Sequence, residues 1–299
     1  MIRYDINEAE LARRAEKVKP GWSARANVRT QQFAQLGFYQ EIGPIWSEIK
    51  DVFRELQKRK CAFCERKLES KKEYDVEHFR PKGSVKPWPV PPELTNAGVV
   101  VKQPANGVKE DGYHLLAYNL LNYSVACAKC NSELKSDYFP IFWNRESNGT
   151  DPVQLNKDEC PLLVFPIGKI DDNPEDIITF HGFSPIAKPP ADKFGHQRAL
   201  LTIKFFKLDD RNQRRELFRG RADVIQKIGQ SFMLLGMPAI SAQTKTRCEN
   251  LIAYHTSDES QYSSCGRAFV KLWKSDPQKA ENLWNESVDW LTTVSPPRR

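Results

Sequence analysis

The chain has 299 residues, of which 40% are hydrophobic and 28% charged, and its formal net charge is +7. The mean hydropathy of −0.60 and the absence of any run of about 18 apolar residues exclude a membrane-spanning protein, so we expect no membrane partner. The mild basic excess permits a nucleic-acid partner without requiring one. The first residues are charged and lack the apolar segment of a signal peptide, which predicts a cytoplasmic protein.

The first 60 residues have the pattern of helices. The strongest pattern covers residues 43–60, where Pro44 suits a first helical turn and apolar residues recur at helical spacing up to Leu56. Residues 84–112 are rich in Pro, Gly and Asn, which predicts a long irregular insertion with a strand at Val99–Val101. Residues 113–135 then become aromatic and aliphatic.

The second half of the chain begins with loops and ends with helices. Short strands are predicted at Leu162–Phe165 and Ile177–Phe180. Helices are predicted at residues 211–229, 241–256, 261–274 and 276–292, the last with Asp276 and Pro277 as its N-cap and first residue. We therefore expect an α+β, mainly helical protein with three regions: 1–60, 61–145 and 146–299.

Two Cys-x-x-Cys pairs, Cys61 with Cys64 and Cys127 with Cys130, indicate a metal site. Disulfides are disfavoured in the cytoplasm, and two such pairs supply the four thiolates of a closed, structural Zn²⁺ site. The alternatives are four buried thiols or a redox-active pair, but no βαβ pattern surrounds either pair. The remaining Cys160, Cys248 and Cys265 are expected to be small buried residues.

Glu77 and His78 form a polar pair within the strand-like run Tyr74–Phe79, between the two cysteine pairs. A carboxylate suits a hard divalent cation, and a neutral imidazole can accept a proton from water. Arg80 and Lys82 follow closely and suit phosphate oxygens. The plain alternative is a surface Glu beside a hydrogen-bonded His, but Asn131, directly after the last cysteine, adds an amide oxygen for a cation.

The order of these motifs over residues 61–140 resembles the HNH endonucleases, whose active site is a ββα-metal unit. The motifs are C-x-x-C, Glu-His-Phe-Arg-Pro-Lys, Asn, C-x-x-C-Asn, Lys and Phe-Pro. The stretch 113–122 resembles the family's aromatic segment that ends in a helper asparagine, here Asn122, with Asn119 as second choice. Residues 160–166 and 201–219 resemble a subgroup found in bacterial anti-phage systems, including Septu-type and retron-associated nucleases.

The resemblance implies a role for each matching residue. His78 would be the general base, and Asn122 would orient it. Glu77, where the family more often has Asp, would hold Mg²⁺ or Mn²⁺ together with Asn131, and Asp75 is the alternative carboxylate. The expected phosphate contacts are Arg80, Lys82 and Lys135. The implied reaction is hydrolysis of DNA, in a defence system that includes a partner ATPase.

Two other functions stay open from the sequence. The chain could be a zinc-stapled DNA-binding or assembly subunit that is catalytically silent without its partner, or it could be an RNA nuclease. Residues 201–230 contain eight Lys or Arg and four acids, which suits either a phosphate-contacting surface or a solvated helix face. Core positions are expected for four tryptophans and structural roles for four histidines: Trp46, Trp273, Trp284, Trp290, His114, His181, His196 and His255.

Overall fold

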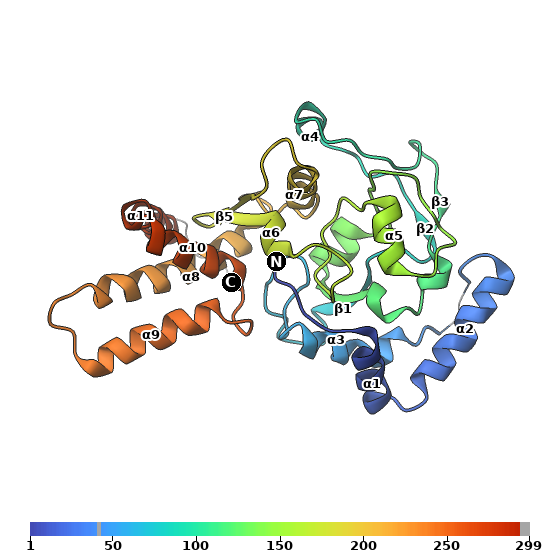
Figure 1. Ribbon diagram of the computed structural model, residues 1–299, viewed down its shortest axis with the longest axis horizontal. Coiled ribbons are helices and arrows are strands. Elements are labelled where there is room, and N and C mark those ends of the chain that lie inside the picture. The colour runs from blue at the N-terminus through green and yellow to red at the C-terminus, as the bar shows by residue number, and fades with distance from the viewer. Residues whose placement is uncertain (41–42, 294–299) are drawn as a thin grey trace.

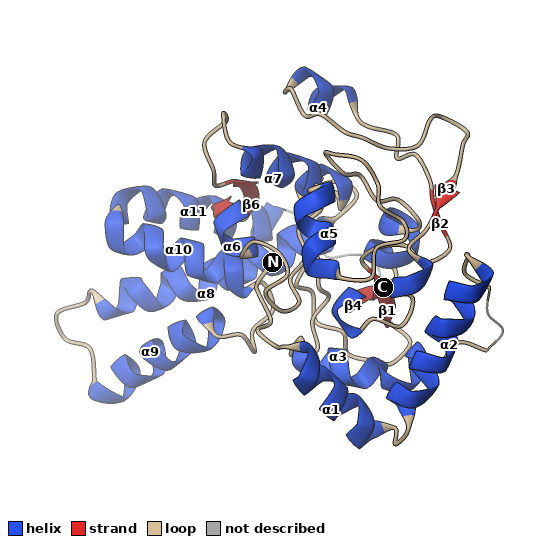
Figure 2. Ribbon diagram, turned by 45° about the vertical axis from the view of Figure 1, so that its right-hand side comes forward, coloured by secondary structure: helices blue, strands red, loops and turns tan. Residues whose placement is uncertain are grey.

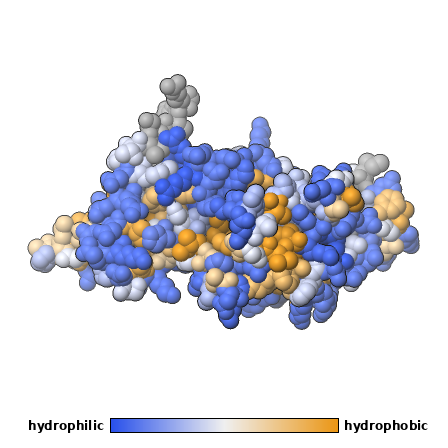
Figure 3. All heavy atoms as spheres, turned by 90° about the horizontal axis from the view of Figure 1, so that it is seen from above, coloured by the Kyte–Doolittle hydropathy of each residue, from blue (hydrophilic) through white to orange (hydrophobic). Residues whose placement is uncertain are grey.

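The computed structural model describes residues 1–40 and 43–293, and these residues form an α+β, mainly helical fold, as predicted (Figure 1). Positions 41–42 of the predicted N-terminal helical region and positions 294–299 of the C-terminal region lie outside the described residues. No described helix is long and apolar enough to cross a membrane. In the view of Figure 3 polar side chains dominate the surface, and apolar ones gather in limited areas.

The described residues before the first cysteine pair are mainly helical. Their elements are α1 (Glu8–Val18), α2 (Trp22–Leu36), the 3-10 helix η1 (Trp46–Ile49) and α3 (Lys50–Leu56). The single helix predicted over residues 43–60 is observed as η1 followed by α3, so it covers only Trp46–Leu56. It ends because Lys58 and Arg59 adopt positive φ angles of 54° and 57°, which turn the chain toward Cys61.

Three two-stranded antiparallel sheets occur in the described residues. The central one pairs β1 (Tyr74–His78) with β4 (Tyr123–Cys127), and its register places Glu77 opposite Ser124 and His78 opposite Tyr123. The long insertion contributes only β2 (Ser84–Val85), α4 (Pro92–Asn96) and β3 (Glu110–Asp111), with β2 and β3 paired. The third sheet pairs β5 (Ile178–His181) with β6 (Ser184–Ala187), which confirms the strand predicted near Ile177–Phe180.

Two predicted strands are absent from the described chain. Val99–Val101 is irregular, and only Lys102, the next residue, forms an isolated bridge, to Ile141. Leu162–Phe165 is also irregular although its side chains are fully buried or nearly so. An apolar run signals burial, but without a neighbouring strand to pair with it does not become a strand.

Short helices join β4 to the C-terminal half. The π-helix η4 (Lys129–Lys135) follows β4. Two 3-10 helices, η2 (His114–Leu116) and η3 (Leu120–Asn122), lie before β4 in the chain. Then come α5 (Pro152–Glu159), α6 (Pro174–Ile177) and α7 (Phe194–Phe205), none of which was predicted. The four predicted C-terminal helices are confirmed with shifted ends as α8 (Arg215–Leu235), α9 (Ala242–Thr256), α10 (Ser263–Ser275) and α11 (Pro277–Thr293).

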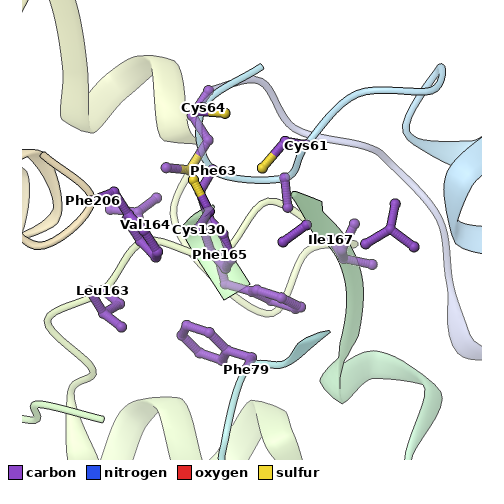
Figure 4. Packing of buried hydrophobic residues seen from close by; sticks show 14 of the residues in the cluster. Cys61, Phe63, Cys64, Phe79, Cys130, Leu163, Val164, Phe165, Ile167 and Phe206 are labelled. Atoms are coloured by element: carbon purple, nitrogen blue, oxygen red, sulfur yellow. The ribbon is translucent and has the colours of Figure 1, made fainter. Parts of the chain in front are cut away.

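The C-terminal helices pack on one another at the left of Figure 1, with α9 at their lower edge, and α2 lies at the right (Figures 1 and 2). The central sheet lies between α2 and the C-terminal helices, with α1 and α3 below it. Aromatic side chains from distant segments meet there: Phe63 stacks on Phe206 with ring centroids 4.2 Å apart, and Phe79 stacks on Phe165 at 4.4 Å (Figure 4). The core is therefore continuous with the walls of the cysteine cluster.

Candidate functional site

The four cysteines of the two Cys-x-x-Cys pairs form one buried cluster. Their sulfur atoms all lie within 4.8 Å of one another, and Figure 4 shows three of them around a common space. The Cys64 and Cys127 sulfurs are 3.9 Å apart, close to the ~3.8 Å that a tetrahedron of Zn–S bonds of about 2.3 Å requires. In the described chain no other group of three or more His, Cys, Asp or Glu side chains is placed to share a metal. The cluster therefore fits the predicted zinc site.

Local backbone structure aims these sulfurs at one point. The Cys61 amide donates to the Arg66 carbonyl, and the Glu65 amide donates to the Cys61 carbonyl, which closes a tight turn around the first pair. Ala62 bonds the Val125 carbonyl at 3.0 Å, and this bond attaches the turn to β4. Because Cys127 ends β4 and Cys130 lies in η4, the cluster joins the helical N-terminal region to the central sheet.

Arg214 contacts the cluster from the C-terminal half. Its two terminal nitrogens each lie 3.7 Å from the Cys130 sulfur, and the residue is 1% exposed. Arg221 is also buried, so two of the eight basic residues in 201–230 face inward. The idea of a continuous phosphate-contacting surface in this segment is wrong for those two residues.

Glu77 is a buried carboxylate paired with a buried lysine. It is 3% exposed, and burial raises its pKa to about 7 even though the ammonium of Lys135 lies 3.2 Å from Oε1. Among the described residues no hydrogen bond of acceptable angle reaches Oε1, nor does one reach the Ser124 hydroxyl on the paired strand. The carboxylate of Glu77, paired with Lys135, and the Ser124 hydroxyl lie on one face of the sheet and offer oxygen ligands for a cation.

His78 is held as a neutral ring, and no described residue forms a hydrogen bond with one of its nitrogens. Its Nε2 lies 3.1 Å from the Ala117 carbonyl, which can only accept, so Nε2 carries the hydrogen and Nδ1 stays available. The rings of Trp46 and Tyr123 pack edge-on against it, each 4.9 Å between centroids. Burial, reinforced by the nearby Lys82 charge, holds the His78 pKa well below its ordinary value.

Asn122 braces the backbone on both sides of the imidazole. Its Oδ1 accepts from the Arg80 amide at 2.8 Å, and its Nδ2 donates to the carbonyls of Arg80 and Leu116 at 3.1 and 3.2 Å. Leu116 immediately precedes the residue that anchors the imidazole. Asn119, the second choice from the sequence, instead caps the Leu121 amide.

The amide of Asn131 and the carboxylate of Asp75 lie in different settings. Asn131 is half-buried in η4, where its Nδ2 makes a long 3.5 Å contact with the Val76 carbonyl. Asp75 is exposed, and its carboxylate accepts from the Val76 amide at 2.8 Å. Of the two candidate carboxylates, only Glu77 is buried against η4.

The three residues predicted to contact phosphate, Arg80, Lys82 and Lys135, differ in burial and in their partners. Arg80 is fully buried and bonds Glu159 at 3.0 Å and Asn156 at 2.7 Å, so it has no open path to a phosphate, contrary to the expectation. Lys135 is likewise fully buried against Glu77. Lys82 alone of the three is half-buried, with no hydrogen bond or ion pair within the described part of the chain.

Several neighbours of the site escaped sequence reasoning. Trp46 was expected only as a core residue, and it does pack on the core, but it also touches His78. Ser124 would have been found by pairing the two strands. No sequence signal pointed to Arg214. As expected, Cys248, Cys265, His114 and His255 are buried, whereas Cys160 and His196 are half-buried and His181 is exposed.

Comparison with known proteins gives one informative match. The chain is 28% identical over 180 residues to the Septu protein PtuB of Bacillus mycoides (strain KBAB4). The aligned residues make up 60% of this chain and 52% of that protein. The chain thus spans about half the length of the curated relative it matches. No protein-family profile matches the chain, and no solved structure matches it. The PtuB similarity makes this chain a distant homologue of a Septu protein.

Proposed function

We propose that this protein is a metal-dependent nuclease of the HNH type that hydrolyses DNA phosphodiester bonds in anti-phage defence. In this proposal β1, β4 and η4 are the ββα unit, and the four-cysteine cluster is its structural zinc site. One observation carries the proposal. A neutral imidazole follows, on one strand, a buried carboxylate: no described residue forms a hydrogen bond with Nδ1 of the ring, and Oε1 of the carboxylate lies 3.2 Å from the Lys135 ammonium.

His78 would act through its free nitrogen. Because Ala117 fixes the hydrogen on Nε2, Nδ1 can accept a proton from a water molecule that attacks the phosphorus. A depressed pKa keeps the ring in this proton-accepting form at neutral pH. Asn122 would act as a positioning residue, because it holds the backbone near both the ring and its carbonyl anchor. The products would carry 5′-phosphate and 3′-hydroxyl ends.

Glu77 and Asn131 would hold the catalytic cation, Mg²⁺ or Mn²⁺, because both offer hard oxygen ligands. When bound, the ion would supply positive charge against the negative charge that develops on the phosphate and the departing oxygen. The burial of Glu77 beside η4, which carries Asn131, supports this role. Lys135 now provides the positive charge beside Oε1 of Glu77, so the cation must share the carboxylate with the lysine or displace it.

The defence role is supported by the similarity to a Septu protein, together with the resemblance of residues 160–166 and 201–219 to nucleases of anti-phage systems. A Septu-type setting implies a protein partner, and we propose a partner ATPase. The three-region division at residues 60/61 and 145/146 belongs to the same proposal, with the nuclease unit in the middle region.

The test is incubation of plasmid DNA with the purified wild-type chain and Mg²⁺ or Mn²⁺, beside His78→Ala. We expect nicked or linear plasmid from the wild type only, since loss of a positioned base costs about 10²–10⁴-fold in rate. Circular dichroism and zinc content should match between the two proteins. Equal cutting by His78→Ala would contradict the assignment of the base.

The buried Glu77–Lys135 ion pair also favours a second candidate, because the carboxylate is already neutralised without a cation. In that case the chain is a zinc-stapled DNA-binding or assembly subunit that cuts only with its partner. Plasmid binding without cutting under all metal conditions would support this candidate. An RNA substrate in a parallel reaction distinguishes an RNA nuclease from a DNA nuclease.

A further inference from the structure

The ammonium of Lys82 lies in a clamp of two aromatic rings. Its Nζ is 4.5 Å from the centroid of the Trp46 ring and 5.5 Å from that of Tyr39, both within the roughly 6 Å over which a ring face attracts a cation. No described residue forms a hydrogen bond or an ion pair with this ammonium, and burial lowers its pKa. A cation that has lost much of its water without gaining an anionic hydrogen-bond partner is suited to take an anion.

The backbone that carries Lys82 is fixed from both sides. The Tyr113 amide donates to the Pro81 carbonyl at 2.8 Å, and the Gly112 amide donates to the Gly83 carbonyl at 3.2 Å. The two backbone segments pass so closely that a Cβ at Gly112 would lie 2.6 Å from the Pro81 carbonyl oxygen. Only glycine fits at this position. The position of the ammonium is therefore set by packing as well as by the rings.

Trp46 joins this clamp to the imidazole. The face of its ring receives Lys82, while the edge-on packing of the same ring on His78 has a centroid separation of 4.9 Å. The Tyr118 ring supports Trp46 from a third direction, with centroids 5.8 Å apart. One side chain thus sets the spacing between a cation of the site and the ring that would accept the proton.

We propose that Lys82, held by Trp46 and Tyr39, forms a phosphate subsite beside His78, and that Trp46 is the positioning residue that sets the distance between them. The ligand is a nonbridging oxygen of a backbone phosphate next to the bond to be cut. This subsite rests on the proposed nuclease function and specifies how the substrate is held. It also replaces Arg80 and Lys135 as the source of phosphate contacts from the protein.

The test measures the affinity for a labelled DNA duplex as a function of salt, with His78→Ala as the background so that no cutting occurs. Each phosphate contact contributes about 0.9 to the slope of log affinity against log salt on B-form DNA. Lys82→Met should therefore reduce the slope by about 0.9. Lys188→Met is the matched control, because that lysine is paired with Asp176 in a distant loop and should leave the slope unchanged.

Trp46 is tested by two substitutions that separate positioning from folding. Trp46→Leu removes the ring and should reduce the slope as Lys82→Met does, while Trp46→Phe keeps an aromatic face and should restore most of it. In the cleavage-competent chain, Lys82→Met should chiefly raise KM. Trp46→Leu should raise KM and also lower kcat, because the imidazole loses its packing. Melting temperature and zinc content report any general loss of structure.

The outcomes separate this inference from the nuclease proposal. An unchanged slope for Lys82→Met in a chain whose wild type cuts DNA overturns the subsite alone. A reduced slope in a chain that never cuts supports the subsite and overturns the nuclease. A Trp46→Phe variant that behaves like Trp46→Leu overturns the role of the aromatic clamp. Absence of nucleic-acid binding by the wild-type chain overturns both proposals.

Discussion

The cysteine cluster and the Glu77–His78 site share the central sheet but differ in how completely they are closed. The cluster has four sulfurs within 4.8 Å of one another, and Arg214 contacts one of them from outside. In the second site, Glu77 is paired with Lys135, and no described residue forms a hydrogen bond with the Ser124 hydroxyl or with Nδ1 of His78. Four thiolates fill every coordination position of a structural zinc ion. A catalytic site instead needs ligand atoms that can still bind a cation or a substrate. The two sites are therefore expected to respond differently to the same perturbation.

Loss of a cluster cysteine should have the largest effect. Cys61→Ser or Cys130→Ser should give insoluble or unfolded protein, because structural Zn²⁺ contributes roughly 10–16 kcal/mol of apparent binding free energy that is also folding free energy. Metal analysis of the wild type should give one zinc per chain. Cys248→Ser, outside the cluster, is the control and should retain its zinc. A wild-type chain that folds without zinc would show that the cluster is not a metal site.

Brief EDTA treatment should separate the two sites. It should stop cleavage while leaving the thiolate-bound zinc largely in place, and Mg²⁺ or Mn²⁺, but not Zn²⁺, should restore activity. Glu77→Ala and Asn131→Ala should each raise the Mg²⁺ concentration needed for half-maximal rescue. Asp75→Ala is the matched control on the same strand, because its carboxylate is exposed and bonded to a backbone amide.

Two results would revise this division. Activity that survives EDTA would show that the second site needs no removable cation. A stronger effect of Asp75→Ala than of Glu77→Ala would assign the cation to the exposed carboxylate. Both measurements use the same metal titration.

Removal of the asparagine brace should have an intermediate effect. Asn122→Ala removes the partner of the buried amide and carbonyl of Arg80, at about 1–3 kcal/mol for each group, whereas the Leu116 carbonyl keeps its bond from the Asn119 amide. We expect a lower melting temperature and a lower kcat with an unchanged Mg²⁺ requirement. Asn122→Asp keeps the acceptor and should lose less than Asn122→Ala. Asn119→Ala is the control, and an equal loss of kcat there would transfer the positioning role to Asn119.

Much of the cluster could be predicted from the sequence, because the spacing of two cysteine pairs restricts the geometry directly. The mainly helical fold could also be predicted, since amphipathic patterns at residues 241–256 and 276–292 reflect burial of one helix face. The ends of helices were harder to predict. The helix expected to reach residue 60 ends at Leu56 because a local turn at Lys58 and Arg59 overrides its apolar periodicity.

The surroundings of Glu77 could not be predicted, because they depend on contacts between distant segments. The sequence offered Arg80, Lys82 and Lys135 as equivalent cations. The fold pairs Arg80 with Glu159, 79 positions along the chain, and leaves Lys82 to two rings from the N-terminal region. Trp46 illustrates the same limit, because an apolar pattern indicates a core position and says nothing of which polar group the ring edge will touch.

Substitution of Arg214, which contacts the cysteine cluster from the C-terminal half, should have the smallest effect. Its guanidinium lies 3.7 Å from the Cys130 sulfur and also donates to the Phe206 carbonyl at 2.7 Å, so it links the cluster to the C-terminal helices. Residues that support metal ligands from outside typically contribute roughly 10–100-fold in metal affinity. Arg214→Met should therefore weaken zinc binding by about that factor, measured by competition with a chromogenic chelator. Arg219→Met, on the exposed face of α8, which begins directly after Arg214, is the control. Equal zinc affinity in the two variants would mean that four thiolates close the cluster without help from α8, and that Arg214 serves only to pack the C-terminal helices.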